Sequence, residues 1–265
     1  MGVYDMYRDY LLYGLTICAL TLTPLTVRAD IFVSGLNAMD RTHYASAYRS
    51  FKPLADEGIA EAQNNIGFLY QNGFGVKRNY NTAIKWYQRA ADQSLAEAEH
   101  NLGVLNYWGW GVSQNFGIAR RWFNKSAEKG LKESHYMIGL MFFKGEGTQA
   151  SIPRASAHFF EAAKLGDPNS QYMLAHMITS GDVESKFKRK NERSSPFDFE
   201  FFGSQETDDL TASLALALLA LHNNQESAAQ LIEFIEFQLD EDNIALANTL
   251  YLECIETDYE KCQLF

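Results

Sequence analysis

The stretch from Ala60 to Gly147 decides the fold of this chain, because one motif recurs in it at a fixed spacing. Its first copy reads Ala60-Glu61-Ala62, Ile66-Gly67, Gly73-Phe74-Gly75-Val76 and Ala83-Ile84-Lys85-Trp86-Tyr87. The second copy, 36 residues later, reads Ala96-Glu97-Ala98, Leu102-Gly103, Gly109-Trp110-Gly111-Val112, Ala119 and Trp122-Phe123. The third copy, 36 residues further on, keeps Ile138-Gly139, Gly145-Glu146-Gly147, Ala155 and Phe159-Phe160. A fixed period between about 20 and 50 residues is typical of stacked repeat proteins.

Each unit is interpreted as two antiparallel helices. In the first full repeat, apolar residues at helical spacing predict helices over 61–71 and 81–92. Gly73 is expected to end the first helix, because glycine adopts positive φ without steric cost. Trp86 and Trp122 occupy equivalent positions, where they are expected to fill the core. The sequence therefore predicts an all-α fold, an α/α solenoid with a C-terminal helical cap.

The flanks of the repeats depart from the motif. Residues 30–59 read as a degenerate capping repeat, whose first helix lacks the glycine expected at position 31, and full repeats are predicted over 60–182. Residues 183–206 form an insertion that displaces the register by 21 residues. Its basic part is either solvated or folded back on the acidic helices, and its Phe-rich part either packs on the solenoid or contacts a partner. Residues 207–265 then form a helical module.

The N-terminus resembles a secretory signal peptide over residues 1–29. Arg8 precedes an apolar stretch over 11–25, and Val27-Arg28-Ala29 places short residues where signal peptidase reads the chain. Cleavage before Asp30 would place the protein in the periplasm without a stable membrane span. The alternative is a retained anchor, although the apolar stretch is shorter than the roughly 20 residues that a span needs.

Removal of the signal would leave Cys254 and Cys262 of the three cysteines. An even pair in an oxidising compartment predicts a disulfide, with two free thiols or an intermolecular bond as alternatives.

Acidic residues are concentrated in the C-terminal part of the chain. Residues 206–265 hold 13 acids and one base, a net −12 in a chain of net −10. This argues against nucleic acid, which needs a basic footprint, and favours a basic protein partner or simple solubility.

The motif Ala-x-Ala, Leu-Gly-x-x-Tyr, Gly-x-Gly-Val and Ala-x-x-Trp-Tyr-x-x-Ala-Ala resembles the Sel-1-like repeat, a relative of the tetratricopeptide repeat. The resemblance covers about 30–183 and 207–228, and the ending from Leu252 to Cys262 looks like the tail of secreted bacterial members. It implies α/α solenoids that bind other proteins, among them envelope regulators and immunity proteins against type VI toxins. A branch with a cysteine pair in each repeat is reported to bind or hydrolyse β-lactams, whereas this chain has no cysteine within 60–181.

Motifs that carry catalytic chemistry are absent from the sequence. It contains no phosphate-binding loop, Gly-x-Ser-x-Gly elbow or His-Glu-x-x-His. His100 and His135 have no helical i, i+4 partner that would make them metal ligands. Asp240-Glu241-Asp242 is interpreted as a turn and helix cap rather than a cation site. We therefore expect no enzyme, no cofactor and no metal.

The candidate binding residues lie where the repeat copies differ. In related solenoids the first helix of each repeat lines the concave face, which suits contact with another chain. Its variable positions form an aromatic-rich row with a polar rim: Asn64, Phe68, Gln71, His100, Tyr107, Tyr136, Phe143, Tyr172 and His176. Some of these, Phe68 foremost, could instead pack between repeats. Trp108 and Trp110 stand where other repeats carry Asn72 or Lys144 and Phe74 or Glu146, so both are candidate partner contacts.

These features favour a periplasmic protein-binding solenoid. The specific expectation is an immunity or inhibitor protein that neutralises a secreted toxin of the type VI kind by occlusion. An envelope scaffold or signalling regulator is the alternative, and a β-lactamase-like hydrolase is the least favoured.

Overall fold

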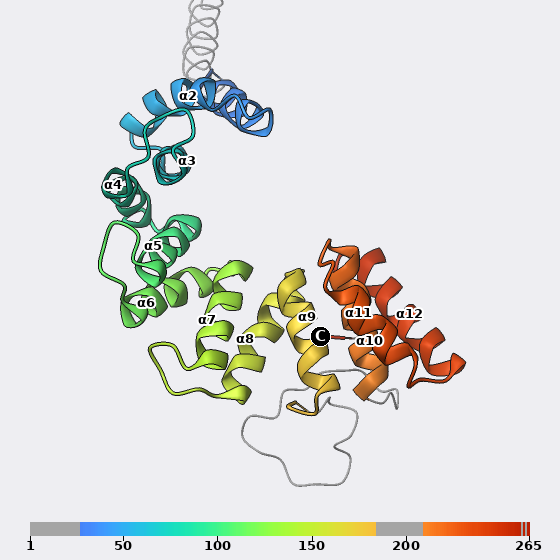
Figure 1. The fold of residues 1–265 in the computed structure, drawn as a ribbon. Helices are drawn as coiled ribbons and strands as arrows, with labels where there is room; N and C mark the ends of the chain where they lie inside the picture. The colour runs from blue at the N-terminus through green and yellow to red at the C-terminus, as the bar shows by residue number, and fades with distance from the viewer. Residues whose placement is uncertain (1–26, 184–208, 261, 263) are drawn as a thin grey trace, which may run out of the picture. The chain divides into compact units, whose positions relative to one another are not determined.

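The computed structural model describes residues 27–183, 209–260, 262 and 264–265, and every regular element in these ranges is a helix (Figure 1). A helix over 27–40 comes first. It is followed by α2 (Tyr44–Asp56), α3 (Ala60–Asn72), α4 (Tyr80–Ala91), α5 (Ala96–Trp108), α6 (Phe116–Ala127), α7 (Lys132–Lys144), α8 (Ile152–Lys164), α9 (Pro168–Thr179), α10 (Asp209–His222), α11 (Ala228–Glu236) and α12 (Glu241–Glu256). The predicted signal peptide and the predicted insertion fall almost wholly outside the described residues.

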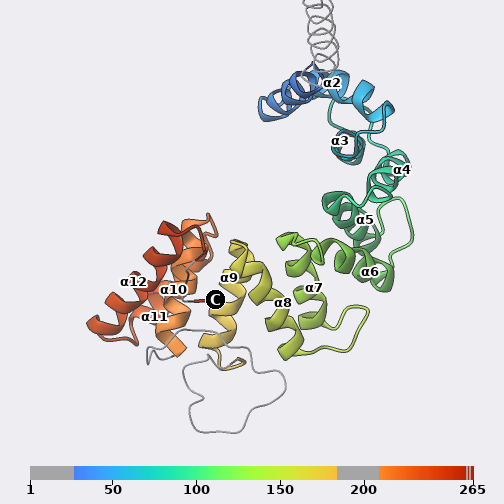
Figure 2. The same cartoon turned by 180° about the vertical axis from the view of Figure 1, so that it is seen from behind.

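The chain divides into two compact units. The first comprises Met1–Leu105 and Gly109–Ser113, and the second comprises Asn106–Trp108 and Gln114–Phe265. Within the first unit α2 packs on α3 and α3 on α4; within the second, the helices from α6 to α10 pack each on the next (Figure 2). This consecutive pairing confirms the predicted α/α solenoid. None of the described helices combines the length and hydropathy that crossing a bilayer requires.

Glycine lets the paired helices approach closely. A Cβ atom built on Gly67 of α3 would lie 2.7 Å from Cδ1 of Tyr87 on α4, and one on Gly139 of α7 would lie 2.7 Å from Cδ1 of Phe159 on α8. Both aromatic rings are fully buried. The motif therefore couples a missing side chain on one helix to a large ring on its partner, which fills the core without a void.

The expectation that the first repeat lacks this glycine is wrong. Gly35, four residues beyond the expected position, lies against the ring of Phe51, with a Cβ-to-Cε1 distance of 2.5 Å if a Cβ were added. The link between the helix over 27–40 and α2 runs over 41–43, whereas the link between α3 and α4 runs over 73–79. The first link is four residues shorter than the second, so the glycine that faces the ring is displaced by about one helical turn from the position that the 36-residue spacing predicts.

The two glycines of the Gly-x-Gly loop have different tasks. Gly73 and Gly145 end α3 and α7 in the left-handed region, at φ of 74° and 75°. The second glycine lies against the start of the preceding repeat's second helix. A Cβ on Gly75 would lie 2.6 Å from the Ala45 nitrogen, and one on Gly147 would lie 2.5 Å from Cβ of Phe116. The second glycine therefore serves the stacking of repeats as well as the turn.

The C-terminal module is built around α10, whose residues 211–217 are all buried. Both α11 and α12 pack on α10, and α11 also touches α9. The Asp240 carboxylate accepts a hydrogen bond from the backbone N–H of Asn243 at 2.8 Å, which confirms its predicted role as a helix cap. α11 is the shortest of the three helices in this module, at 9 residues against 14 in α10 and 16 in α12.

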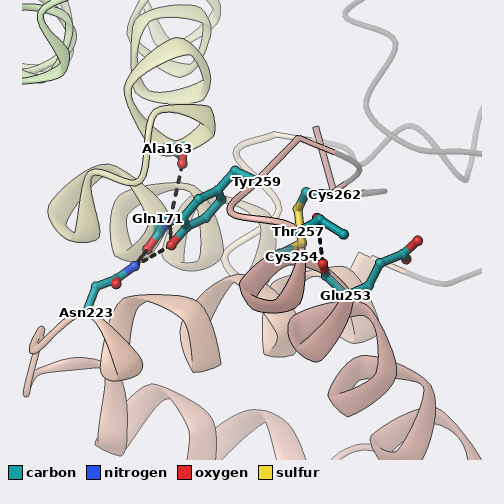
Figure 3. The surroundings of a disulfide bond; sticks show 8 residues. All are labelled: Ala163, Gln171, Asn223, Glu253, Cys254, Thr257, Tyr259 and Cys262. Carbon is teal, nitrogen blue, oxygen red and sulfur yellow. Dashed lines mark hydrogen bonds between the residues drawn. A yellow bond between two sulfur atoms is a disulfide. The ribbon is translucent and has the colours of Figure 1, made fainter.

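A disulfide between Cys254 and Cys262 ties the C-terminal tail to α12 (Figure 3). Within the closed loop, the Tyr259 hydroxyl accepts hydrogen bonds from Nδ2 of Asn223 at 2.6 Å and Nε2 of Gln171 at 3.3 Å. Beyond it, Leu264 is fully buried, and the ring of Phe265 lies 5.7 Å from that of Phe160 on α8. The tail therefore returns to α8 and α9 and covers the end of the repeat stack.

Candidate protein-binding surface

Trp108 is the most exposed tryptophan that the structure describes, with 54% of its surface open to solvent. It ends α5, and its ring meets the ring of Tyr107 edge-on, with centroids 4.9 Å apart. Asn72 and Lys144, at the equivalent positions of the neighbouring repeats, are also exposed. Since the position faces solvent in all three repeats, a tryptophan there presents a large apolar surface that the core does not use.

Trp110 lies in the loop after α5 and is 37% exposed. Its ring stacks on that of Tyr80, with centroids 5.8 Å apart and planes 21° apart. The guanidinium of Arg78 lies 5.6 Å from the centroid of Tyr80. The loop is held close by Gly111, on which a Cβ would lie 2.5 Å from Cβ of Tyr80. Tyr80, which sequence reasoning missed, thus holds the Trp110 ring in place by stacking against one of its faces.

The other candidates of the first unit are half-buried and make internal contacts. Oδ1 of Asn64 accepts a hydrogen bond from Nδ2 of Asn101 at 2.9 Å, and Oε1 of Gln71 accepts one from the Tyr87 hydroxyl at 2.8 Å. Phe68 meets the ring of Phe74 edge-on at 5.9 Å. Their polar atoms and rings are thereby held in fixed orientations, and each side chain keeps part of its surface in solvent.

His100, the remaining candidate of this unit, is also half-buried. Burial lowers its pKa to about 4. Its imidazole is therefore neutral at pH 7, so it offers a hydrogen-bonding ring rather than a charge.

The expectation that Tyr107 lines the surface is wrong. Only 3% of this residue is exposed, and its hydroxyl donates a hydrogen bond to the Glu146 carboxylate. Its ring also meets that of Phe116 edge-on at 5.3 Å. Burial, followed by the Glu146 hydrogen bond, raises the pKa of Tyr107. Glu146, in the Gly-x-Gly loop of the next repeat, holds Tyr107 in a buried position, and the buried Tyr107 ring packs against that of Trp108.

The candidates on α7 and α9 differ in exposure. Phe143 is 38% exposed and His176 is exposed, whereas Tyr136 and Tyr172 are half-buried. The ring of Tyr136 lies 5.9 Å from that of the core residue Phe159. The ring of Tyr172 lies 6.2 Å from that of His176. Among the predicted contact residues of the second unit, Trp108, Phe143 and His176 are therefore the most available to a partner.

Trp86 lies in the core as predicted, with 8% of its surface exposed. Trp122 is only half-buried, and Lys125 lies 4.6 Å from its ring centroid. Its indole is thus shared between the core and a cation–π contact at the surface.

His135 has no i, i+4 partner on its own helix, but the structure places a histidine of the next helix beside it. Nδ1 of His135 on α7 and Nδ1 of His158 on α8 lie 3.3 Å apart. The ring of His158 stacks on Phe142, with planes 14° apart. Burial lowers the pKa of both histidines, that of His158 to about 4. Among the described residues no three or more His, Cys, Asp or Glu side chains gather as they would around a metal ion.

Two surface residues that sequence reasoning missed lie on α11 and just after it. Phe234 is 57% exposed and Phe237 is 92% exposed. The aliphatic residues at 231, 232, 235 and 239 share one side of this segment at 100° per residue, and Phe237 lies on the opposite side. A phenylalanine on the polar side of an amphipathic helix was the signal that could have identified them.

The comparisons with known proteins agree with this architecture. A family model described as Sel1 repeat matches residues 60–95, 96–131 and 132–167. The solved Sel1 repeat protein of Oxalobacter formigenes is 23% identical, with a TM-score of 0.57, over 76% of this chain and 74% of that chain. A search of curated proteins found no match.

Two further solved structures share the fold. A protective antigen of uropathogenic Escherichia coli with an SLR fold is 23% identical, with a TM-score of 0.62, over 89% of this chain and 47% of the antigen. This chain thus spans about half the length of that relative. The Pseudomonas aeruginosa protein PA5086 is 14% identical, with a TM-score of 0.52, over 90% of this chain and 84% of that chain.

The fold and its exposed aromatic residues define an α/α solenoid of the kind that binds other proteins. The chain contains three consecutive Sel1 repeats over residues 60–167. Repeats of this kind mediate contacts between proteins, so the match indicates a protein-interaction solenoid.

Proposed function

We propose that this chain is a periplasmic immunity protein that neutralises a secreted toxin by covering the toxin's active site. The observation that carries the proposal is Trp108, a tryptophan 54% exposed at a repeat position that faces solvent in every copy. Exposed aromatic residues on a rigid support are the usual centres of binding energy in protein interfaces. A toxin occluded by such a surface needs no chemistry from its inhibitor.

Three further features support the proposal. The N-terminal sequence reads as an export signal, which would place the protein where toxins from neighbouring cells arrive. Phe143 and His176 present additional side chains on α7 and α9 of the same unit. The disulfide between Cys254 and Cys262 suits an oxidising compartment, because disulfides form and persist there.

The direct test is capture from periplasmic extract followed by an activity assay. The purified chain should recover an enzyme with toxin-like activity and inhibit it at a near-stoichiometric ratio. Capture of a sensor or a polysaccharide-synthesis machine would instead identify an envelope regulator. Turnover of a chromogenic β-lactam by the folded protein would identify a hydrolase.

The substitution Trp108→Ala tests the surface itself. We expect it to weaken capture by about 10-fold or more, the loss typical of a central aromatic contact. Its thermal unfolding should stay close to that of the parent, since the ring is mostly exposed. Lys144→Ala, at the equivalent exposed position of the next repeat, is the matched control and should leave capture unchanged. Equal affinity of both variants and the parent would retire Trp108 as a contact.

A further inference from the structure

The outer side of α11 carries two phenylalanines that keep more than half of their surface exposed in the described structure. Phe234 is 57% exposed, and Phe237 directly after the helix is 92% exposed. They are three residues apart, so they share one side of the helix. We call this side, with its flanking residues over 226–242, the α11 outer face.

The core does not require these two side chains. α11 attaches to α10 and α9 through Ala228, Ile232 and Ile235, which are at most 8% exposed. A phenylalanine at 92% exposure adds nothing to this contact and keeps almost its whole ring in water. Paired exposed aromatic residues on one helix side are typical of an interaction site rather than of a folding element.

The charge around the two rings is of one sign. The sequence 226–242 contains six acids and no Lys or Arg: Glu226, Glu233, Glu236, Asp240, Glu241 and Asp242. All six are exposed. The described residues of 209–265 contain no Lys or Arg to neutralise them. The face therefore combines an apolar centre with an acidic rim, and its potential attracts cations.

This combination decides between occupants. A second copy of the chain would bring the same acidic rim against itself, and like charges across an interface oppose association. A partner with apolar side chains between Lys or Arg residues satisfies both parts of the face at once. A cationic amphipathic helix has this chemistry, and it would lie along α11 with its apolar side on the two rings.

We propose that the α11 outer face is a docking surface for a cationic amphipathic segment of a partner protein. Apolar side chains of the partner cover Phe234 and Phe237, and its basic side chains meet Glu233, Glu236 and the acidic turn over 240–242. The surface lies outside the candidate residues on α5, α7 and α9. The docking of a cationic segment does not depend on whether the partner is a toxin, so its test is independent of the proposed function.

The experiment measures binding of a defined peptide to the full chain by fluorescence anisotropy. The probe is an amphipathic Leu/Lys helix of about five turns, or about 18 residues. A Leu/Glu peptide and a Ser/Lys peptide of equal length are the ligand controls. The Leu/Lys peptide should bind more tightly than both. Raising the ionic strength from about 0.01 M to about 0.1 M should weaken it, because the Debye length falls from about 30 Å to about 10 Å.

Variants assign the binding to this face. The double variant F234A/F237A should lose about 10-fold or more in affinity, as expected for central aromatic contacts. The double variant E233Q/E236Q should lose less and should show a shallower salt dependence. Leu252→Ala on α12, where the leucine is 49% exposed, is the matched apolar control and should bind like the parent. All variants should unfold at the same temperature as the parent, since these side chains are exposed.

Several outcomes would overturn the proposal. Unchanged affinity of F234A/F237A would show that the peptide responds to net charge alone. A parent that is dimeric in sedimentation and becomes monomeric in F234A/F237A would show a second copy on the face. Tighter peptide binding by K186Q/K188Q/K190Q, together with a lower unfolding temperature of F234A/F237A, would show that the chain's own segment 184–208 occupies it.

Discussion

Gly67 and Gly139 show how one missing side chain sets the distance between two helices. In both cases the glycine faces an aromatic ring so closely that a Cβ would lie 2.7 Å from it, shorter than real Cβ contacts allow. The cost of a substitution is therefore steric rather than conformational, since both glycines lie inside helices where alanine is otherwise favoured.

We expect Gly67→Ala to lower the free energy of unfolding by about 1–3 kcal/mol, the cost of overpacking a filled core. Urea unfolding measures the change. Gly117→Ala is the control, because Gly117 lies in the first turn of α6 and a Cβ there meets only the Asn115 Oδ1 at 3.4 Å. That variant should be neutral or slightly more stable, by up to about 1 kcal/mol. A Gly67→Ala protein as stable as the parent would show that Tyr87 can move aside.

The His135–His158 pair predicts a loss of stability in acid. Burial and the neighbouring His135 lower the pKa of His158 from its usual 6.5 to about 4, so folding holds it neutral. As pH falls below 6.5 the unfolded chain gains a proton that the folded chain does not bind until about pH 4. The stabilisation is therefore complete above pH 6.5 and is lost between these two values.

The substitution His158→Phe keeps a ring against Phe142 and removes the titrating group. We expect the fall in melting temperature between pH 6.5 and about 4 to be smaller in this variant than in the parent. His176→Phe, at an exposed position of α9, controls for the loss of one histidine and should follow the parent. A His158→Phe protein with the parent's full pH dependence would place the acid sensitivity elsewhere.

At the scale of elements, the C-terminal tail is a cover rather than an extension of the solenoid. α10 packs on the last repeat helix, α9, and the tail covers a further part of the surface of α8 and α9. Tyr259 closes part of it, since its hydroxyl joins Gln171 of α9 to Asn223 after α10 (Figure 3). Its ring also lies 3.2 Å from the Cβ that a side chain at Gly166 would have. A terminal repeat of a solenoid needs such a cap.

Removing the disulfide should loosen this cover. We expect the double variant C254A/C262A to lose about 2–3 kcal/mol of unfolding free energy, because the unfolded chain regains the freedom of a short closed loop. Urea unfolding with and without reductant provides the comparison. The reduced parent should match the variant, and reductant should not change the variant. Equal stability of the oxidised parent and the variant would show that the packing of Leu264 and Phe265 alone holds the tail.

At the scale of the whole molecule, most contacts within each unit join helices that follow one another along the chain, and the pairs α10–α12 and α9–α11 of the C-terminal module are the exceptions. Stability in such an array is a sum of local terms, so a defect in one repeat is felt chiefly by its neighbours. Charge is distributed in the same modular way. The acidic residues gather in the C-terminal module, whereas the span 30–205 is close to neutral at about +2. The repeats and the module therefore offer surfaces of different chemistry to partners.

The sequence by itself determined the repeat, the helices and the core. A 36-residue period is visible in the sequence alone, because every copy packs its two helices in the same way and therefore keeps the same glycines, alanines and aromatic rings. The cap at Asp240 and the pairing of Cys254 with Cys262 were also predictable, since both depend on residues close together in the chain.

Exposure was decided only by the tertiary structure. Tyr107 and Trp108 are adjacent in sequence, yet the first is 3% exposed and the second 54%. The difference arises because Glu146 and Phe116, from other elements of the second unit, close over Tyr107. The sequence pattern could have suggested Phe237 as a contact, but its 92% exposure is known only from the packing of α11 on α10 and α9. Periodicity reports which residues repeat, but which of their surfaces stay in water depends on neighbours distant in the chain.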